Sequence, residues 1–182
     1  MASAFTHAAA ALALGTAFRN PGPPARFWIL GAAFAVVPDL DGIGFWLGVP
    51  YESAFGHRGF SHSIAFAALL ASVGLLAFRD DPVPRPRTRL FLFLATASHG
   101  ILDAMTSGGG GVAFFVPFHD ERYFFPWRPI LVSPMSVRRF FSERGVRILA
   151  SEIVCVWIPA ATFAVIVLAL RNRRRVTAVA DP

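Results

Sequence analysis

The sequence predicts an all-α membrane protein, a polytopic helix bundle of about five spans with a metal site between the helices. Three observations lead to this prediction. Hydrophobic residues make up 55% of the 182 residues and charged residues only 15%, whereas an average soluble domain carries roughly 25% charged residues. The apolar residues are gathered into runs that approach the length of a membrane span. Histidine and aspartate recur inside those runs, where ionisable groups are costly and mark function.

The candidate spans are five apolar runs of 17 to 23 residues, close to the ~20 that a transmembrane helix needs. In chain order they are Ala2–Phe18, Phe27–Val49, Ser61–Phe78, Leu90–Thr106 and Ile148–Leu170. The first does not read as a signal peptide, because no basic residue precedes its apolar stretch. The second is interrupted by Pro38, and we expect the fifth to be the least interrupted. Together the runs predict one integral membrane domain over residues 1–170.

The charges indicate how this domain lies in the membrane. All 17 basic residues are arginine, against 11 acidic residues. These arginines flank the apolar runs, which indicates membrane topology and not a nucleic-acid partner. The positive-inside rule assigns the Arg-rich tail 171–182 and the loop 79–89 to the cytoplasm. The outer segment 108–147 mixes aromatic residues with proline, which predicts an interfacial cover, with a disordered loop as the alternative.

Seven side chains of metal-ligand type lie in or beside four of these runs: His7, Asp39, Asp41, His57, His62, His99 and Asp103. From the arginine at the cytoplasmic end of its own run, each run's His and Asp lie 10 to 17 residues along, with His57 beyond. At ~1.5 Å per helical residue this is ~15–25 Å, in the outer half of a hydrocarbon core ~30 Å thick. Four separate runs therefore place such residues near one level, which predicts a shared site near the outer face.

The residue types indicate which ions the site would hold. Imidazole and carboxylate ligands suit Zn, Mn or Fe, and this set has room for about two or three ions. His99 and Asp103 are four residues apart and share one helix face. Asp39 and Asp41 flank a proline-induced break, so both can turn toward one centre. Taken alone, each of these side chains is equally well explained by an interhelical hydrogen bond or a loop position.

The segment His57-Arg58-Gly59-Phe60-Ser61-His62-Ser63 also carries candidate substrate contacts. Arg58 can hold an anionic oxygen, such as that of a phosphate, through two hydrogen bonds. We predict that Arg58, Ser61 and Ser63 bind substrate, with a helix N-cap as the alternative for Ser61. Asp41 or His119 would relay protons as the catalytic group; His119 lies in the outer segment and is otherwise a solvated loop residue.

These motifs occur in one order along the chain: Thr6-His7, Pro38-Asp39-Leu40-Asp41, the His57–Ser63 segment, His99 to Asp103, a glycine-rich stretch and Pro117-Phe118. In that order they resemble the YdjM/YbcI-like family of bacterial inner-membrane proteins, regarded as metal-dependent hydrolases, over about residues 1–130. That family is thought to be distantly similar to zinc-dependent phospholipase C and P1-type nucleases. The resemblance implies an inner-membrane location and a ligand role for the seven His and Asp residues, and it leaves the substrate open.

The sequence thus predicts a membrane-bound metal-dependent hydrolase, a phosphoesterase that acts on a lipid or a lipid-linked phosphate. No HExxH metalloprotease motif and no GxSxG nucleophile motif is present in the sequence. The alternative is a non-enzymatic membrane protein that binds or transports metal. A third interpretation takes the His and Asp residues as hydrogen-bonding contacts between helices, and predicts no bound metal.

Overall fold

The computed structural model describes residues 1–18, 23–79, 85–134 and 140–180, and these form helices and no strand. The helical elements are α1 (Ala4–Phe18), α2 (Ala25–Phe34), η1 (Val37–Phe45), η2 (Phe60–His62), α3 (Ile64–Gly74), η3 (Leu75–Phe78), α4 (Arg85–Ala104), α6 (Glu143–Glu152), η4 (Ile153–Trp157) and α7 (Ile158–Ala180). The all-α prediction is therefore confirmed. Arg19, which marks the end of the first predicted span, lies outside the described residues, as do Arg138 and Arg139.

Two continuous helices are long and apolar enough to cross a membrane. They are Ala25–Phe45, of 21 residues, and Glu143–Arg173, of 31 residues. The apolar helices Ala4–Phe18 and Ile64–Phe78 are shorter; 15 residues of α1 reach ~22 Å, less than a hydrocarbon core of ~30 Å. The 20-residue α4 begins with three arginines in its first five residues. The count of five spans therefore remains a prediction.

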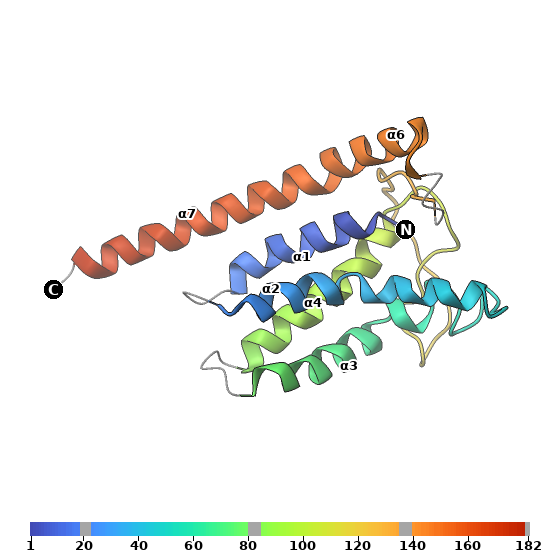
Figure 1. The fold of residues 1–182 in the computed structure, drawn as a ribbon, viewed down its shortest axis with the longest axis horizontal. Helices are drawn as coiled ribbons and strands as arrows, with labels where there is room; N and C mark the ends of the chain where they lie inside the picture. The colour runs from blue at the N-terminus through green and yellow to red at the C-terminus, as the bar shows by residue number, and fades with distance from the viewer. Residues whose placement is uncertain (19–22, 80–84, 135–139, 181–182) are drawn as a thin grey trace.

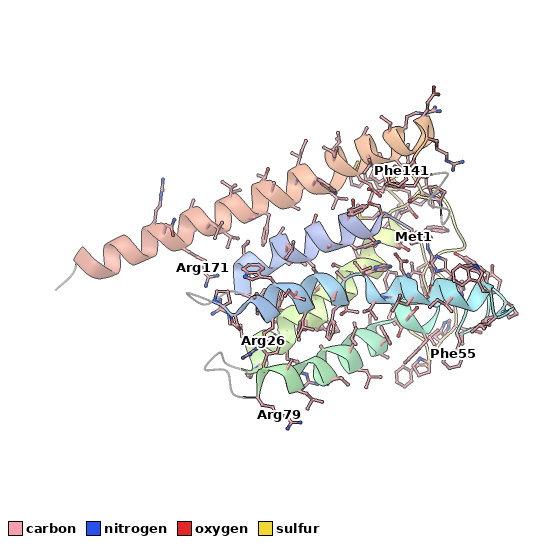
Figure 2. The ribbon with its side chains drawn as sticks, viewed as in Figure 1. Met1, Arg26, Phe55, Arg79, Phe141 and Arg171 are labelled. Carbon is pink, nitrogen blue, oxygen red and sulfur yellow. The ribbon has the colours of Figure 1, made fainter. Side chains whose placement is uncertain are left out.

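The helices form a bundle in which α4 contacts α1, α2 and α3, and α1 also contacts α7 (Figure 1). The long α7 lies along the outside of α1, on the side away from α3 (Figure 1). Arg26, Arg79 and Arg171 gather at one end of the bundle, whereas Met1 and Phe55 lie toward the other (Figure 2). We call these the arginine end and the loop end. The predicted cytoplasmic ends of three runs thus share one end of the molecule.

An apolar core holds the arginine end together. Phe91 of α4 is fully buried and stacks on Phe27 of α2, with ring centroids 4.3 Å apart. Its ring also lies against two glycines, because a Cβ atom at Gly31 would come within 2.3 Å of the Phe91 ring and one at Gly15 within 3.2 Å. Small residues at helix contacts let the backbones approach closely, which is how helices associate in a membrane.

The predicted break at Pro38 is a change of helix type. The α-helix α2 ends at Phe34, and the chain continues as the tighter 3₁₀ helix η1 from Val37 to Phe45. Pro38 lies in the first turn of η1, where its missing N–H group costs no helical hydrogen bond. Both aspartates of the predicted site therefore remain on a helix and do not lie in an unwound segment.

The segment that follows α4 covers the loop end. The Phe114 carbonyl accepts from the Ile64 N–H at 2.9 Å, and the Arg58 carbonyl accepts from the Ala113 N–H at 2.9 Å. The Arg122 guanidinium donates to the His57 carbonyl at 2.9 Å. Over its described residues this segment is thus tied down by hydrogen bonds, as the predicted cover requires. Its interfacial position remains a prediction, and so does the division between the membrane domain and the tail.

Candidate metal centre

The structure brings all seven predicted ligand side chains into one cluster between the helices. They come from α1 (His7), η1 (Asp39 and Asp41), the segment ending in η2 (His57 and His62) and α4 (His99 and Asp103). None of the seven side chains is more than 9% exposed. The cluster lies near the start of the chain, because the Ala2 N–H donates to Asp103 at 2.8 Å. The metal-ligand role of each residue remains a prediction.

Four of these side chains present one ligand atom each to a common point. The Nε2 atoms of His62 and His99 are 3.0 Å apart. Asp39 Oδ1 lies 3.3 Å from His99 Nε2 and 3.9 Å from His62 Nε2. Asp103 Oδ2 lies 3.6 Å from His62 Nε2 and 4.0 Å from His99 Nε2. Four ligands held ~2.0–2.1 Å from a tetrahedral zinc are ~3.3 Å apart, so the group has the composition and spacing of a divalent-ion site.

The hydrogen bonds of the Nδ1 atoms of His62 and His99 determine which nitrogen of each ring carries the proton. His62 Nδ1 lies 3.1 Å from Asp41 Oδ2, and His99 Nδ1 lies 2.7 Å from the Ala35 carbonyl oxygen. Because a carboxylate and a carbonyl only accept hydrogen bonds, we assign the proton of each neutral ring to Nδ1. The two Nε2 lone pairs then face each other at 3.0 Å, which is repulsive unless a proton or a metal ion lies between them. A carboxylate or carbonyl behind the ring is the usual support of a metal-binding histidine.

Several buried polar atoms in the cluster have no hydrogen-bond partner among the described residues. They are both carboxylate oxygens of Asp39 and both ring nitrogens of His7, whereas Asp103 Oδ2 is ion-paired with Arg58 Nε at 3.0 Å. Each such atom costs about 1–3 kcal/mol when it is left uncompensated. The His7 ring stacks on His99 at a centroid distance of 3.7 Å, and its Nε2 lies 3.5 Å from Asp103 Oδ1. A cation at this point would compensate the Asp39 carboxylate and one ring nitrogen of His7, so the residues fit a bound divalent ion.

Asp41 does not contribute to the point where the ligand atoms of the four-residue group converge; it contacts the other side of the His62 ring. Its carboxylate lies 2.6 Å from His57 Nδ1 and accepts from the Ser61 hydroxyl at 2.5 Å. A contact of 2.6 Å is a hydrogen bond, since two ligands on one ion are ~3.3 Å apart. With three residues per turn of 3₁₀ helix, Asp39 and Asp41 leave η1 in different directions. Asp41, His57 and His62 still form a second group that could hold an ion, but their hydrogen bonds favour Asp41 as the carboxylate that orients His62.

Arg58 is fully buried and contacts the protein with all three guanidinium nitrogens. Its Nε lies 3.0 Å from Asp103 Oδ2, Nη1 donates to the Gly108 carbonyl at 3.0 Å, and Nη2 donates to the Thr106 hydroxyl at 3.0 Å. Its backbone adopts φ 63°, in the left-handed region that a side chain seldom occupies. In this arrangement Arg58 fixes the Asp103 carboxylate, and its predicted contact with substrate remains a prediction.

The structure also places the two serines and His119. Ser61 donates to Asp41, and Ser63 caps α3 by accepting from the Phe66 N–H at 3.0 Å. The N-cap is therefore Ser63, which is buried, and not Ser61. His119 is exposed in the outer segment, where Nδ1 accepts from the Glu121 N–H at 3.3 Å, and the structure does not bring it into the cluster among the residues described.

Sequence reasoning missed Glu152, a fully buried carboxylate on the helix that was expected to be least interrupted. Its Oε1 accepts from the Ser3 N–H at 2.6 Å, and its Oε2 accepts from the hydroxyls of Ser3 and Thr6 at 2.6 and 2.8 Å. Thr6 in turn accepts from the Trp157 indole N–H at 2.7 Å. Glu152 thereby ties α6 to the first turn of α1, next to the residue that holds Asp103. The available signal was an acidic residue inside an apolar run.

Comparison with known proteins gives one family and one similar curated protein. The family model described as YdjM inner membrane protein matches residues 1–176. The chain is 38% identical over 163 residues to Inner membrane protein YbcI of Escherichia coli strain K12, and the match covers 87% of this chain and 92% of that protein. No solved structure matches the chain.

Proposed function

This chain belongs to the YdjM inner membrane protein family, and from that premise we propose that it is a metal-dependent hydrolase that cleaves a phosphate ester of a lipid. The family membership confirms the resemblance predicted from the motifs, and with it the location in the inner membrane. The observation that carries the proposal is the pair of Nε2 atoms on His62 and His99, 3.0 Å apart beside two carboxylates. This arrangement suits a divalent cation, for which zinc, manganese or iron is the candidate.

The cluster residues have distinct roles in this proposal. Asp39, His62, His99 and Asp103 would hold the ion. When bound, a divalent ion supplies Lewis acidity toward a phosphoryl oxygen and lowers the pKa of water to ~7. Asp41 orients His62, and in this proposal it would also relay a proton. A second or third ion would involve His7 and His57, which lie on either side of the four-residue group.

A lipid substrate is supported by the surroundings of the least buried side of the cluster. Asp39 and Asp41 are the two most exposed members, at 9% and 7%, and both lie on η1. The outward side of η1 carries Leu40 and Ile43, which are 59% and 49% exposed. A substrate would therefore approach past apolar side chains that face the membrane, and a lipid or lipid-linked phosphate can do so.

A second candidate function is favoured by the burial of the ligands. Four protein ligands around one ion, all closed off from solvent, are typical of a structural metal site, whereas catalytic sites keep an open position. A non-enzymatic metal-binding role is therefore the alternative. Metal transport receives less support, because the arginine end of the bundle is packed with apolar side chains, Phe27, Phe34, Phe78 and Phe91 among them, and a transport path needs polar groups across the membrane.

The test is hydrolysis of defined phospholipids and isoprenoid phosphates by the purified protein, assayed with zinc and with manganese. We expect phosphate-ester cleavage that His99→Ala abolishes. Ser98→Ala is the matched control, because Ser98 donates to the Ala95 carbonyl on the same helix and lies outside the cluster. Equal turnover in wild type and His99→Ala would assign the activity to a contaminant. Bound metal without turnover on any of these lipids would favour the non-enzymatic role.

A further inference from the structure

A cavity of about 300 Å³ lies beside the first turns of α6, and none of its lining residues belongs to the metal cluster. Its lining is Ser107, Leu131, Val132, Arg144, Arg147 and Ile148. The volume is at the small end of the range for ligand pockets in proteins. We propose that this cavity, the α6 pocket, binds the phosphate group of an anionic phospholipid at the membrane surface.

The charge of the α6 pocket comes from two arginines one turn apart on the same helix. Arg144 and Arg147 are both exposed, and neither forms an ion pair with any residue in the described part of the chain. Two guanidinium groups at this spacing can converge on one phosphate group, which they bind through charge-assisted hydrogen bonds. Two uncompensated positive charges that line one cavity therefore indicate an anionic ligand.

The walls of the α6 pocket are held in place by hydrogen bonds that do not involve the arginines. The Val132 N–H donates to the Ser107 hydroxyl at 3.2 Å, and the Leu131 N–H donates to the Ser151 hydroxyl at 3.0 Å. The Ser107 N–H donates to the Ile130 carbonyl at 2.8 Å. The pocket is thus formed before a ligand arrives, which lowers the entropic cost of binding.

The surroundings favour a lipid over a free anion. Leu131, Val132 and Ile148 give the pocket apolar walls that suit the first methylene groups of an acyl chain. Phe141, just before α6, and Val146 are 79% and 69% exposed, so the start of α6 presents apolar and basic side chains together. That combination is typical of a helix end that contacts lipid headgroups.

The position of these arginines in the bundle gives a separate argument. α6 lies at the loop end, opposite Arg26, Arg79 and Arg171 (Figures 1 and 2). The positive-inside rule accounts for arginines at one end of a membrane protein and offers no reason for a pair at the other. A bound lipid phosphate supplies that reason, and it would anchor the loop end at the headgroup layer.

The experiment is native mass spectrometry of the full chain in detergent, titrated with phosphatidylglycerol and, separately, with phosphatidylcholine of the same acyl chains. We expect one phosphatidylglycerol to bind in preference to phosphatidylcholine. Arg144→Gln/Arg147→Gln should weaken its binding about 20- to 30-fold, since each arginine near a lipid surface contributes about fivefold. Arg89→Gln/Arg173→Gln removes the same charge from exposed positions at the arginine end and should leave the binding unchanged.

Two further measurements complete the experiment. The first distinguishes binding in the α6 pocket from a general effect of surface charge, and the second distinguishes a lipid ligand from a free anion. Leu131→Trp fills the α6 pocket while all arginines remain, and it should also abolish the preference for phosphatidylglycerol. Inorganic phosphate at equal concentration should not displace the lipid. Each of four outcomes would overturn the proposal. They are equal losses of lipid binding in the two double variants, normal lipid binding in Leu131→Trp, displacement of the lipid by inorganic phosphate, and no preference for phosphatidylglycerol. Because the readout is lipid binding, it does not depend on the metal centre or on hydrolysis.

Discussion

The two ends of the bundle are built from the same helices and are held together by different interactions. At the arginine end, Phe91 of α4 packs against Phe27 of α2 and the glycines of α1 and α2, and these contacts are between apolar groups. At the loop end, the same α4 presents His99 and Asp103 to α1 and η1, and the contacts are between buried polar groups. One helix thus changes from an apolar to a polar interface within about three turns.

The difference shows at which end the buried groups find all their partners within the chain. Apolar packing needs no further partner, and the arginine end has that packing. The loop end leaves Asp39 and His7 with buried polar atoms that have no hydrogen-bond partner among the described residues. In this account the arginine end is stabilised by its own apolar packing, and the metal cluster of the loop end is organised around a group that the chain itself does not supply. The predictions that follow test this separation, from the largest expected effect to the smallest.

The largest expected effect is on the arginine end. Phe91→Ala should lower the free energy of unfolding in detergent by about 3–5 kcal/mol, because it leaves a cavity where three helices meet. The metal content of the protein that remains folded should not change. Leu90→Ala is the matched control, since Leu90 is the adjacent residue and is 48% exposed. A loss of metal in folded Phe91→Ala would show that the two ends are not independent.

The second effect concerns the contact between α6 and α1. Glu152→Ala should lower the free energy of unfolding by about 2–3 kcal/mol, because the Ser3 N–H and the hydroxyls of Ser3 and Thr6 lose a buried acceptor. Glu152→Gln keeps one carbonyl oxygen and should cost less. Both variants should still bind the same number of ions per chain, since Glu152 is not in either candidate ligand group. Loss of the ion in Glu152→Gln would place Glu152 among the ligands.

The third effect sharpens the role of Asp41. If Asp41 orients His62 without touching the ion, Asp41→Asn should lower metal affinity by about 10- to 100-fold and keep the stoichiometry. Competition with a chelator measures this change. Ser61→Ala removes a neighbouring hydrogen bond to the same carboxylate and should have a smaller effect. A whole ion lost in Asp41→Asn would mean that Asp41, His57 and His62 hold an ion of their own.

Much of the site could be predicted because the number of residues between a side chain and the arginine that flanks its span gives the depth of that side chain in the membrane. Each of four runs carries its His and Asp a similar number of residues from its flanking arginine, so their common level followed from the rise per residue. The all-helical fold followed from the apolar runs. The resemblance to the family followed from the order of the motifs, which the full-length family match bears out.

The remaining features depend on contacts that no run of sequence records. Asp41 contacts Nδ1 of His62 because of the 3₁₀ geometry of η1. A proline break in the sequence does not by itself predict this contact. The contacts of Arg58 with Asp103 and Gly108 join segments 45 to 50 residues apart. Glu152 was overlooked because its partners, Ser3 and Thr6, lie at the opposite end of the chain and look like ordinary helix residues.

The most direct test of the account is the metal content per chain of the detergent-purified protein, measured by elemental mass spectrometry. The proposed centre predicts at least one transition-metal ion per wild-type chain, and its loss in a folded His99→Ala/Asp103→Ala variant. Ser98→Ala should keep the ion. If wild-type protein holds no stoichiometric metal even after reconstitution with zinc or manganese, the cluster is a hydrogen-bonded contact between helices and the proposed hydrolase mechanism is wrong.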